Sequence, residues 1–132
     1  MPASMNPDMA KGKNATSAIT KKRFVKLDPN AADQESVLQC NTAGEAAYGV
    51  ALFSCSLAEA TRGKGVSVIT DGRAVVEAGG TVNIGQLVTT DVNGRAVVAA
   101  AGNYIMGMCD ENGGGGTGTE LGIMLFVAAG KA

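Results

Sequence analysis

The chain has 132 residues, a net charge of −1 at pH 7 and a hydrophobic fraction of 45%, which fits one domain with short extensions. It contains no histidine, so the commonest general base and the commonest zinc ligand are excluded. Its three cysteines, Cys40, Cys55 and Cys109, are far apart in the sequence, which excludes a zinc knuckle and a thioredoxin-like motif. The sequence therefore predicts no catalytic, cofactor or metal site, and an enzyme is the least expected class.

The side chains available for the core are small. Glycine accounts for 19 residues, aromatic residues for only 4%, and tryptophan is absent. A core of alanine and valine buries less apolar area per residue than a core of leucine and phenylalanine. We therefore expect stability to depend in part on self-association or on a partner surface.

The charges divide the chain into a basic N-terminal segment and an acidic body. Residues 1–27 carry six basic residues and one acid, a net charge of +5, whereas residues 28–132 carry five basic residues and eleven acids, a net charge of −6. Residues 1–20 are polar, which predicts a mobile arm and no signal peptide, and hence synthesis in the cytosol. No apolar stretch is long enough to predict a membrane span.

Two interpretations of this arm, residues 1–27, stay open. It is either a solvated tail or a segment that becomes ordered on an acidic protein surface. Nucleic acid is a less favoured partner, because the body is acidic and no aromatic residue lies among the lysines to stack bases.

The body, residues 28–127, has the pattern of short strands separated by turns, and residues 128–132 form a short tail. The stretch Lys22–Leu27 before it predicts an edge strand. Asn93-Gly94 is the strongest hairpin signal and joins two of the strands, Leu87–Thr90 and Ala96–Ala99. The remaining predicted elements are strands at Ser36–Asn41, Ala46–Ser56, Val66–Thr70, Ala74–Ala78, Tyr104–Cys109 and Leu121–Val127, with a helical turn at Leu57–Thr61. The predicted fold class is mainly β, a small Gly/Ala/Val-rich β-barrel or β-sandwich with an extended N-terminal arm.

Two repeats support a structural β-module. The nine residues Gly72–Gly80 return at Gly94–Gly102 with seven identities. A wider echo joins the apolar run from Tyr48 to Cys55 with the run from Tyr104 to Cys109. Because Cys55 and Cys109 occupy matching places, both are predicted to face the core as small apolar groups; a disulfide and a reactive thiol are the less favoured alternatives.

Three motifs suggest chemistry but have simpler explanations. Gly113-x-Gly115-x-x-Gly118 has the spacing of a dinucleotide fingerprint, but a strand and not a helix follows it, so a loop is predicted. Asp91–Gly94 and Asp110–Gly113 are similar to the start of calcium loops but lack further oxygen ligands, so hairpin turns are preferred over a weak cation site. Arg73 and Arg95 occupy equivalent places after their turns, either as solvated charges or as an interface that faces an acidic partner.

From about Gln39 to Val127 the chain resembles the small capsid decoration (cement) proteins of tailed bacteriophages. The resemblance rests on an apolar Gly-Val-Ala stretch, a Gly-rich bend before a Val-rich strand, and "Gly-x-Leu-Val" and "Asn-Gly-x-Ala" turns. These occur here as Gly49-Val50-Ala51-Leu52, Gly65-Val66-Ser67-Val68, Gly85-Gln86-Leu87-Val88 and Asn93-Gly94-Arg95-Ala96-Val97. It implies a protein that binds the outer surface of a phage capsid, with the major capsid protein as its partner. It also implies a homotrimer that clamps adjacent capsomers.

The residues expected to contact the shell lie at the end of the arm. They are Lys21, Lys22, Arg23, Phe24 and Lys26, with the positive charges steering the encounter and Phe24 anchoring it. Two other classes stay open. One is a self-assembling β-rich fibre or shell subunit; the other, less favoured, is a basic-armed nucleic-acid-binding protein.

Overall fold

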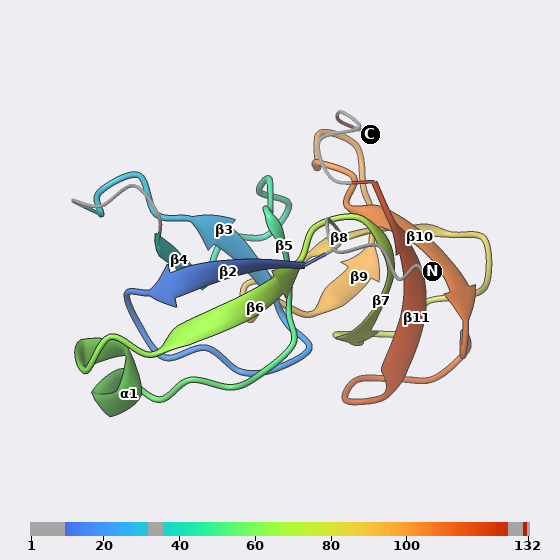
Figure 1. Ribbon diagram of the computed structural model, residues 1–132. Coiled ribbons are helices and arrows are strands. Elements are labelled where there is room, and N and C mark those ends of the chain that lie inside the picture. Colours follow the sequence, from blue (N-terminus) through green and yellow to red (C-terminus); the bar gives the residue numbers. More distant parts are fainter. Residues whose placement is uncertain (1–9, 32–35, 127–130, 132) are drawn as a thin grey trace.

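The computed structural model describes residues 10–31, 36–126 and 131, and it is built almost wholly of short strands. Figure 1 shows two β-rich halves side by side, formed by consecutive parts of the chain. The mainly-β class is confirmed. None of the helices in the described part of the chain is long and apolar enough to cross a membrane.

The first half is a closed five-stranded barrel in the order β2-β4-β3-β5-β6. Strands β2 and β4 pair in parallel, and every other neighbouring pair is antiparallel. A short helix, α1 (Leu57–Thr61), begins at Ser56 in a capping box with Glu59, which satisfies amide groups at the helix start. The strands are β2 (Ala10–Ala15), β3 (Phe24–Leu27), β4 (Ser36–Gln39), β5 (Gly49–Ala51) and β6 (Gly65–Ile69).

The second half is a five-stranded sheet in the order β7-β11-β10-β8-β9, with all of its neighbouring strands antiparallel. Its two edge strands, β7 and β9, approach each other through an isolated parallel bridge between Ala78 and Ala96. The sheet is therefore strongly curled, and its two edge strands lie next to each other at this bridge. Its strands are β7 (Gly72–Glu77), β8 (Leu87–Thr90), β9 (Ala96–Val98), β10 (Gly107–Glu111) and β11 (Glu120–Leu125).

The two halves have the same topology. If β2, β3, β4, β5 and β6 are matched in order with β7, β8, β9, β10 and β11, each strand has the same neighbours in the same orientation. The parallel pair β2–β4 corresponds to the parallel bridge between β7 and β9. The described chain is thus one five-strand arrangement built twice in tandem.

This duplication explains the wider sequence echo. Tyr48 packs against the core of the barrel, and Tyr104 packs against the core of the second half. A lysine ammonium lies over each ring, at 5.3 Å from the ring centroid for Lys13 on Tyr48 and at 4.9 Å for Lys131 on Tyr104. The two echoed cysteines are buried, one in each core.

The closer repeat has a different origin. Its two copies, Gly72–Gly80 and Gly94–Gly102, contain the edge strands β7 and β9 of one sheet. Each copy begins with a glycine in the left-handed region, with φ of 84° at Gly72 and 78° at Gly94. The copies meet at the bridge between Ala78 and Ala96, so they close one sheet and do not mark a duplicated unit.

The cores of the two halves are joined because strands of the barrel bury side chains on both faces. On β3, Val25 points into the barrel cluster, whereas its neighbour Phe24 belongs to the larger cluster of the second half. On β5, Ala51 and Val50 divide in the same way. This follows from the alternation of side chains along a strand.

Residues 10–27 do not form the expected mobile arm. Strands β2 and β3 lie within this range, and Phe24 and Val25 are fully buried. The expected edge strand is also wrong, since β3 lies between β4 and β5 in a closed barrel. Residues 1–9 lie outside the described residues. Of the 128–132 tail only Lys131 is described, and it bridges to Tyr104.

Several predicted elements are confirmed. The strand predicted at Leu87–Thr90 pairs antiparallel with the strand that follows Asn93-Gly94, and the helical turn at Leu57–Thr61 is α1. The strand predicted over Ala46–Ser56 is much shorter, at Gly49–Ala51. Val127, the end of the predicted last strand, lies outside the described residues.

Each half places a glycine where its fourth strand approaches its fifth. A Cβ at Gly49 would collide with the carbonyl oxygen of Ile69, and a Cβ at Gly107 would collide with that of Met124. We expect Gly49→Ala and Gly107→Ala each to lower the free energy of unfolding by about 1–3 kcal/mol, as overpacked sites do. Denaturant unfolding measures the change. The control is Gly116→Ala, where a Cβ meets open space; an equal loss in all three variants would contradict this packing.

The cysteines provide a second test of the packing. All three are free and buried, and burial raises the pKa of the Cys40 thiol to about 12. Because the thiolate is the nucleophile, we expect no rapid reaction of the folded protein with Ellman's reagent at mildly alkaline pH. The unfolded protein should react fully. A rapidly reacting thiol in the folded protein would show that one of the cores is open.

Candidate interaction surfaces

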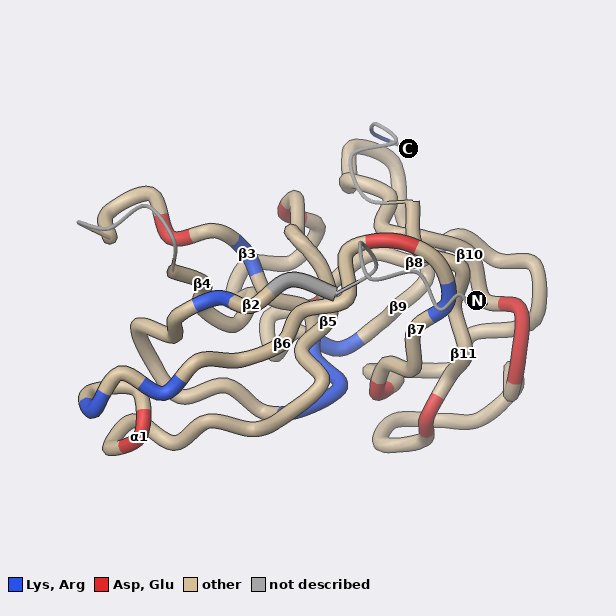
Figure 2. Tube along the Cα trace, in the orientation of Figure 1, with Lys and Arg blue, Asp and Glu red and all other residues tan. Residues whose placement is uncertain are grey.

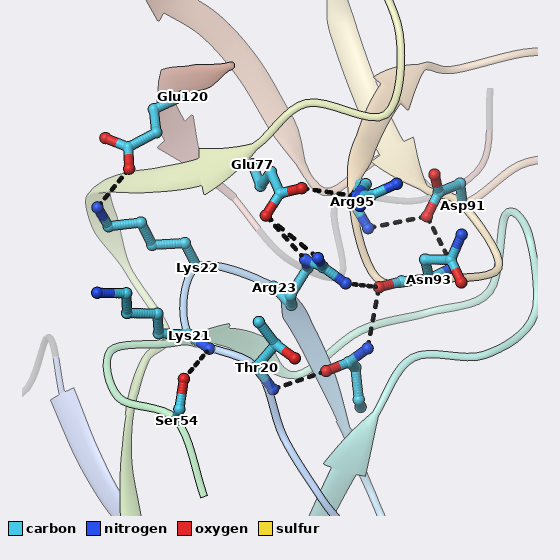
Figure 3. Close-up of polar contacts among 11 residues, drawn as sticks. Thr20, Lys21, Lys22, Arg23, Ser54, Glu77, Asp91, Asn93, Arg95 and Glu120 are labelled. Atoms are coloured by element: carbon cyan, nitrogen blue, oxygen red, sulfur yellow. Dashed lines mark hydrogen bonds and ion pairs between the residues drawn. The ribbon is translucent and has the colours of Figure 1, made fainter. Parts of the chain in front are cut away.

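The junction between the halves is organised by one carboxylate. Glu77, at the end of β7, accepts hydrogen bonds from the guanidinium of Arg23 at 3.2 Å and from Nε of Arg95 at 2.7 Å (Figure 3). The side chains are only 12% exposed for Arg23, 21% for Glu77 and 27% for Arg95. Charge-assisted bonds of this kind are strong where water is partly excluded. Glu77, on the edge strand β7, therefore connects Arg23 of the barrel with Arg95, which lies just before the other edge strand, β9.

Backbone hydrogen bonds reinforce the same junction. The amide of Phe24 donates to Gly94 O at 2.7 Å, and the amide of Glu77 donates to Lys22 O at 2.8 Å. The Arg23 guanidinium also donates to Asn93 O at 3.0 Å. A Cβ at Gly94 would lie 3.1 Å from Phe24 O, so the close approach of the β8–β9 turn to the barrel favours glycine there.

The residues predicted to contact a shell are mostly engaged within the molecule. Phe24 is fully buried, so it cannot anchor a partner while the protein is folded. Arg23 belongs to the junction, and Lys22 pairs with Glu120 (Figure 3). Lys21 is exposed. The acids that bind these cations lie 54 residues away for Arg23 and 98 for Lys22, so no local sequence signal identified them.

Lys26, the last of the predicted contacts, forms an internal ion pair. Its ammonium lies 2.7 Å from a carboxylate oxygen of Glu45 and 2.9 Å from Oδ1 of Asn41. Burial acts to raise the pKa of Glu45, but hydrogen bonds from Lys26 and from two backbone amides outweigh it and hold that pKa below its usual value. The pair is thus formed at neutral pH and contributes stability that is lost as the pH falls through this lowered pKa.

The two arginines predicted to form an interface have separate internal partners. Arg73 donates to Glu111 at 2.7 Å and to Asp110 at 2.9 Å, while Arg95 binds Glu77. The structure does not bring the two arginines together as a pair. Arg73 is still 52% exposed, so its surroundings are a mixed-charge surface on the second sheet.

A groove on the barrel half is lined by three lysines. It has a volume of about 930 Å³ and lies between strands β2 and β6 and the loops that carry Lys21 and Phe53. Lys13, Lys21 and Lys64 line it, and the described residues of its lining include no acid, although Lys64 is paired with Glu59 at 3.1 Å. Phe53 is 59% exposed at the same place. We call this set of residues the basic groove.

The second half carries an apolar stripe across three neighbouring strands. Met108 on β10 is paired directly with Met124 on β11 and with Leu87 on β8. These side chains are between 36% and 41% exposed. They form a continuous row because directly paired residues of neighbouring strands share one face.

Charge is unevenly distributed between the halves (Figure 2). Residues 10–69 contain eight basic residues and five acids, whereas residues 70–132 contain three basic residues and six acids. The barrel half thus carries +3 and the second half −3. Among the described residues, no group of three or more Cys, Asp or Glu side chains is placed to hold a metal ion.

The junction predicts a large difference between two glutamates. Glu77→Gln leaves two half-buried arginines without their shared carboxylate, and we expect a loss of about 1–3 kcal/mol in the free energy of unfolding. Glu120→Gln removes an exposed ion pair and should cost less than about 1 kcal/mol. Denaturant unfolding at neutral pH compares the two. Equal losses would contradict the central role of Glu77.

Comparison with known proteins identifies the fold. No family model matches the chain, and no curated protein sequence matches it. A crystal structure of the N base of head fiber gp8.5 in bacteriophage phi29 matches over 93% of this chain and 96% of that chain, with a TM-score of 0.71 and 17% sequence identity. The chain therefore has the fold of that fibre base along nearly its whole length.

Proposed function

We propose that this protein is a structural component of a bacteriophage virion that binds the outer surface of the capsid. The observation that carries the proposal is the match with the phi29 head fibre base, which extends over both halves of the chain. The absence of histidine and the small, Ala/Val-rich core support a structural role over an enzymatic one.

The proposed mechanism is linkage between binding and shell stability. A protein that binds the assembled shell, but not its separated subunits, stabilises the shell by mass action. Many copies that each clamp neighbouring capsomers of the major capsid protein multiply weak contacts into avidity. A homotrimeric state, as implied by the decoration-protein resemblance, would place three binding surfaces on one particle site. No cofactor is needed for this mechanism.

The surface proposed for contact differs from the one expected from sequence. Of the five expected residues, Lys21 lies in the basic groove, whereas Arg23 and Phe24 are built into the junction. The barrel half, with its net positive charge, is therefore proposed to face the shell. The acidic second half would then point outward.

A second candidate is a self-assembling fibre or shell subunit. The apolar stripe of Met108, Met124 and Leu87 favours it, because an exposed row of large apolar side chains on a sheet face suits contact with another copy. A subunit of this kind should grow into larger assemblies as its concentration rises. A capsid-binding protein should remain a monomer or a small closed oligomer.

Co-sedimentation with empty, undecorated tailed-phage capsids tests the function. The full chain is required, because removal of residues 1–27 would delete β2 and β3. We expect saturable binding and an increased resistance of the shell to heat. No binding to capsids, together with concentration-dependent growth of the protein alone in analytical ultracentrifugation, would contradict capsid binding and favour the fibre or shell subunit.

A further inference from the structure

Strand β7 is paired along only one of its two edges. On one side it pairs with β11 over its whole length, from Gly72 to Glu77. On the other side the bonds lie at its end, where the amide of Glu77 donates to Lys22 O at 2.8 Å and Ala78 bridges to Ala96. The first part of β7 thus has no strand paired along this second edge within the described chain.

The alternation of hydrogen bonds along β7 identifies the unpaired backbone groups. The amide of Ala78 donates to Thr119 O on the β11 side at 2.7 Å, whereas the amide of Glu77 donates to the opposite side. Because alternate residues of an edge strand direct their N–H and C=O groups away from the neighbouring strand, Val75 and Arg73 share the direction of Glu77. On that side, neither makes a backbone hydrogen bond to another described residue. Each therefore leaves a donor and an acceptor available.

Arg73 and Val75 also line a groove at the junction of the two halves. The groove has a volume of about 340 Å³, and its opposite side is formed by Ala51 and Leu52 of the barrel, with Ile69 at the end of β6. Val75 is 42% exposed and Leu52 is 37% exposed. We call this set of residues the junction groove. Unpaired strand edges beside pockets for apolar side chains are what proteins use to bind extended peptides as an added strand.

The charged side chains of the junction groove already have partners. Lys22 pairs with Glu120 (Figure 3), and Arg73 pairs with Asp110 and Glu111. The groove therefore selects its ligand through backbone hydrogen bonds and apolar contacts, and not through net charge.

We propose that the junction groove binds an extended segment of a shell protein, which adds as a strand to the unpaired edge of β7 and places an apolar side chain against Leu52 and Val75. The segment has no proline at the residues that pair with β7, because those residues donate an N–H. The choice of a shell protein as the source of the segment rests on the proposed function.

A second copy of the chain is the competing occupant, because unpaired strand edges also join identical molecules. It fits the groove less well. The barrel stands directly beside the edge, since Lys22 O bonds to β7 and Leu52 lines the opposite side of the groove. A single extended segment can enter this space, whereas the edge of a second folded sheet would meet the barrel.

Fluorescence anisotropy with a labelled peptide of alternating threonine and valine tests the groove. Val75→Pro removes an N–H from the unpaired edge and none from the ladder with β11, and Leu52→Glu removes the apolar side of the groove. Each should weaken binding by about fivefold to tenfold. The matched controls, Val92→Pro and Ile84→Glu, make the same changes at exposed positions outside the groove and should leave binding nearly unchanged. Circular dichroism melts establish which variants remain folded, and Leu52→Glu tests the groove without altering the backbone of β7.

A second peptide separates strand addition from simple apolar adhesion. The same sequence, N-methylated throughout, keeps its side chains but has no backbone donors, and we expect it to bind at least about tenfold more weakly. Equal binding of the two peptides would overturn strand addition.

Four further outcomes would also overturn the proposal. They are no peptide binding by the unmodified protein, equal weakening by Val75→Pro and Val92→Pro, a dimer in analytical ultracentrifugation that Val75→Pro abolishes, and displacement of the probe by a synthetic peptide of residues 1–9. The last two assign the groove to a second copy and to the chain's own first residues, respectively.

Capsid co-sedimentation distinguishes this inference from the proposed function. If the groove variants bind capsids as well as the unmodified protein does, the junction groove fails as the contact and shell binding stands. If the peptides give the expected pattern but the unmodified protein does not bind capsids, the shell-binding function fails and strand addition to β7 stands.

Discussion

The carboxylate of Glu77 is the constraint on which the rest of the structure depends. It lies between Arg23 of the barrel half and Arg95 of the second half, and all three side chains are mostly buried. Each arginine is costly to bury alone, and together they would repel each other without the acid between them. Around this contact the two halves pack together, since Phe24 and Val50 of the barrel strands β3 and β5 belong to the hydrophobic cluster of the second half. The two halves, whose cores consist mainly of small side chains, thus form a single structural unit.

The same constraint divides the positive charges into two groups. Arg23, Lys22 and Lys26 are paired with acids of the folded chain and contribute to its stability. Lys13, Lys21 and Lys64 line a groove on the barrel half, where Lys64 is paired with Glu59. The second half, which has a net charge of −3, presents an apolar stripe instead. The two halves of the molecule therefore present chemically different surfaces.

The sequence predicted local structure well where turn chemistry decides it. Asn93-Gly94 predicted the β8–β9 hairpin because few residues other than glycine adopt the φ of 78° found there. Prediction from the sequence failed where contacts between residues far apart in the chain determine the structure. Lys21–Lys26 resembled a basic arm because the partners Glu77 and Glu120 lie far along the chain, and the basic groove was missed because Phe53 meets the lysines only in the folded barrel. The similarity between the runs that begin at Tyr48 and Tyr104 reflects the duplication of the five-strand unit. The repeat of Gly72–Gly80 at Gly94–Gly102 instead corresponds to the two edge strands of one sheet.

Native-state hydrogen exchange tests most directly whether the junction unites the two halves. The amides of Phe24 and Glu77 donate across it, while the amide of Met106 donates to Val88 O within the second half. If the junction opens only when the whole protein unfolds, all three amides exchange with the free energy of global unfolding. Exchange of Phe24 and Glu77 with a much smaller opening free energy than Met106 would mean that the halves separate while folded, and would contradict a single body held by Glu77.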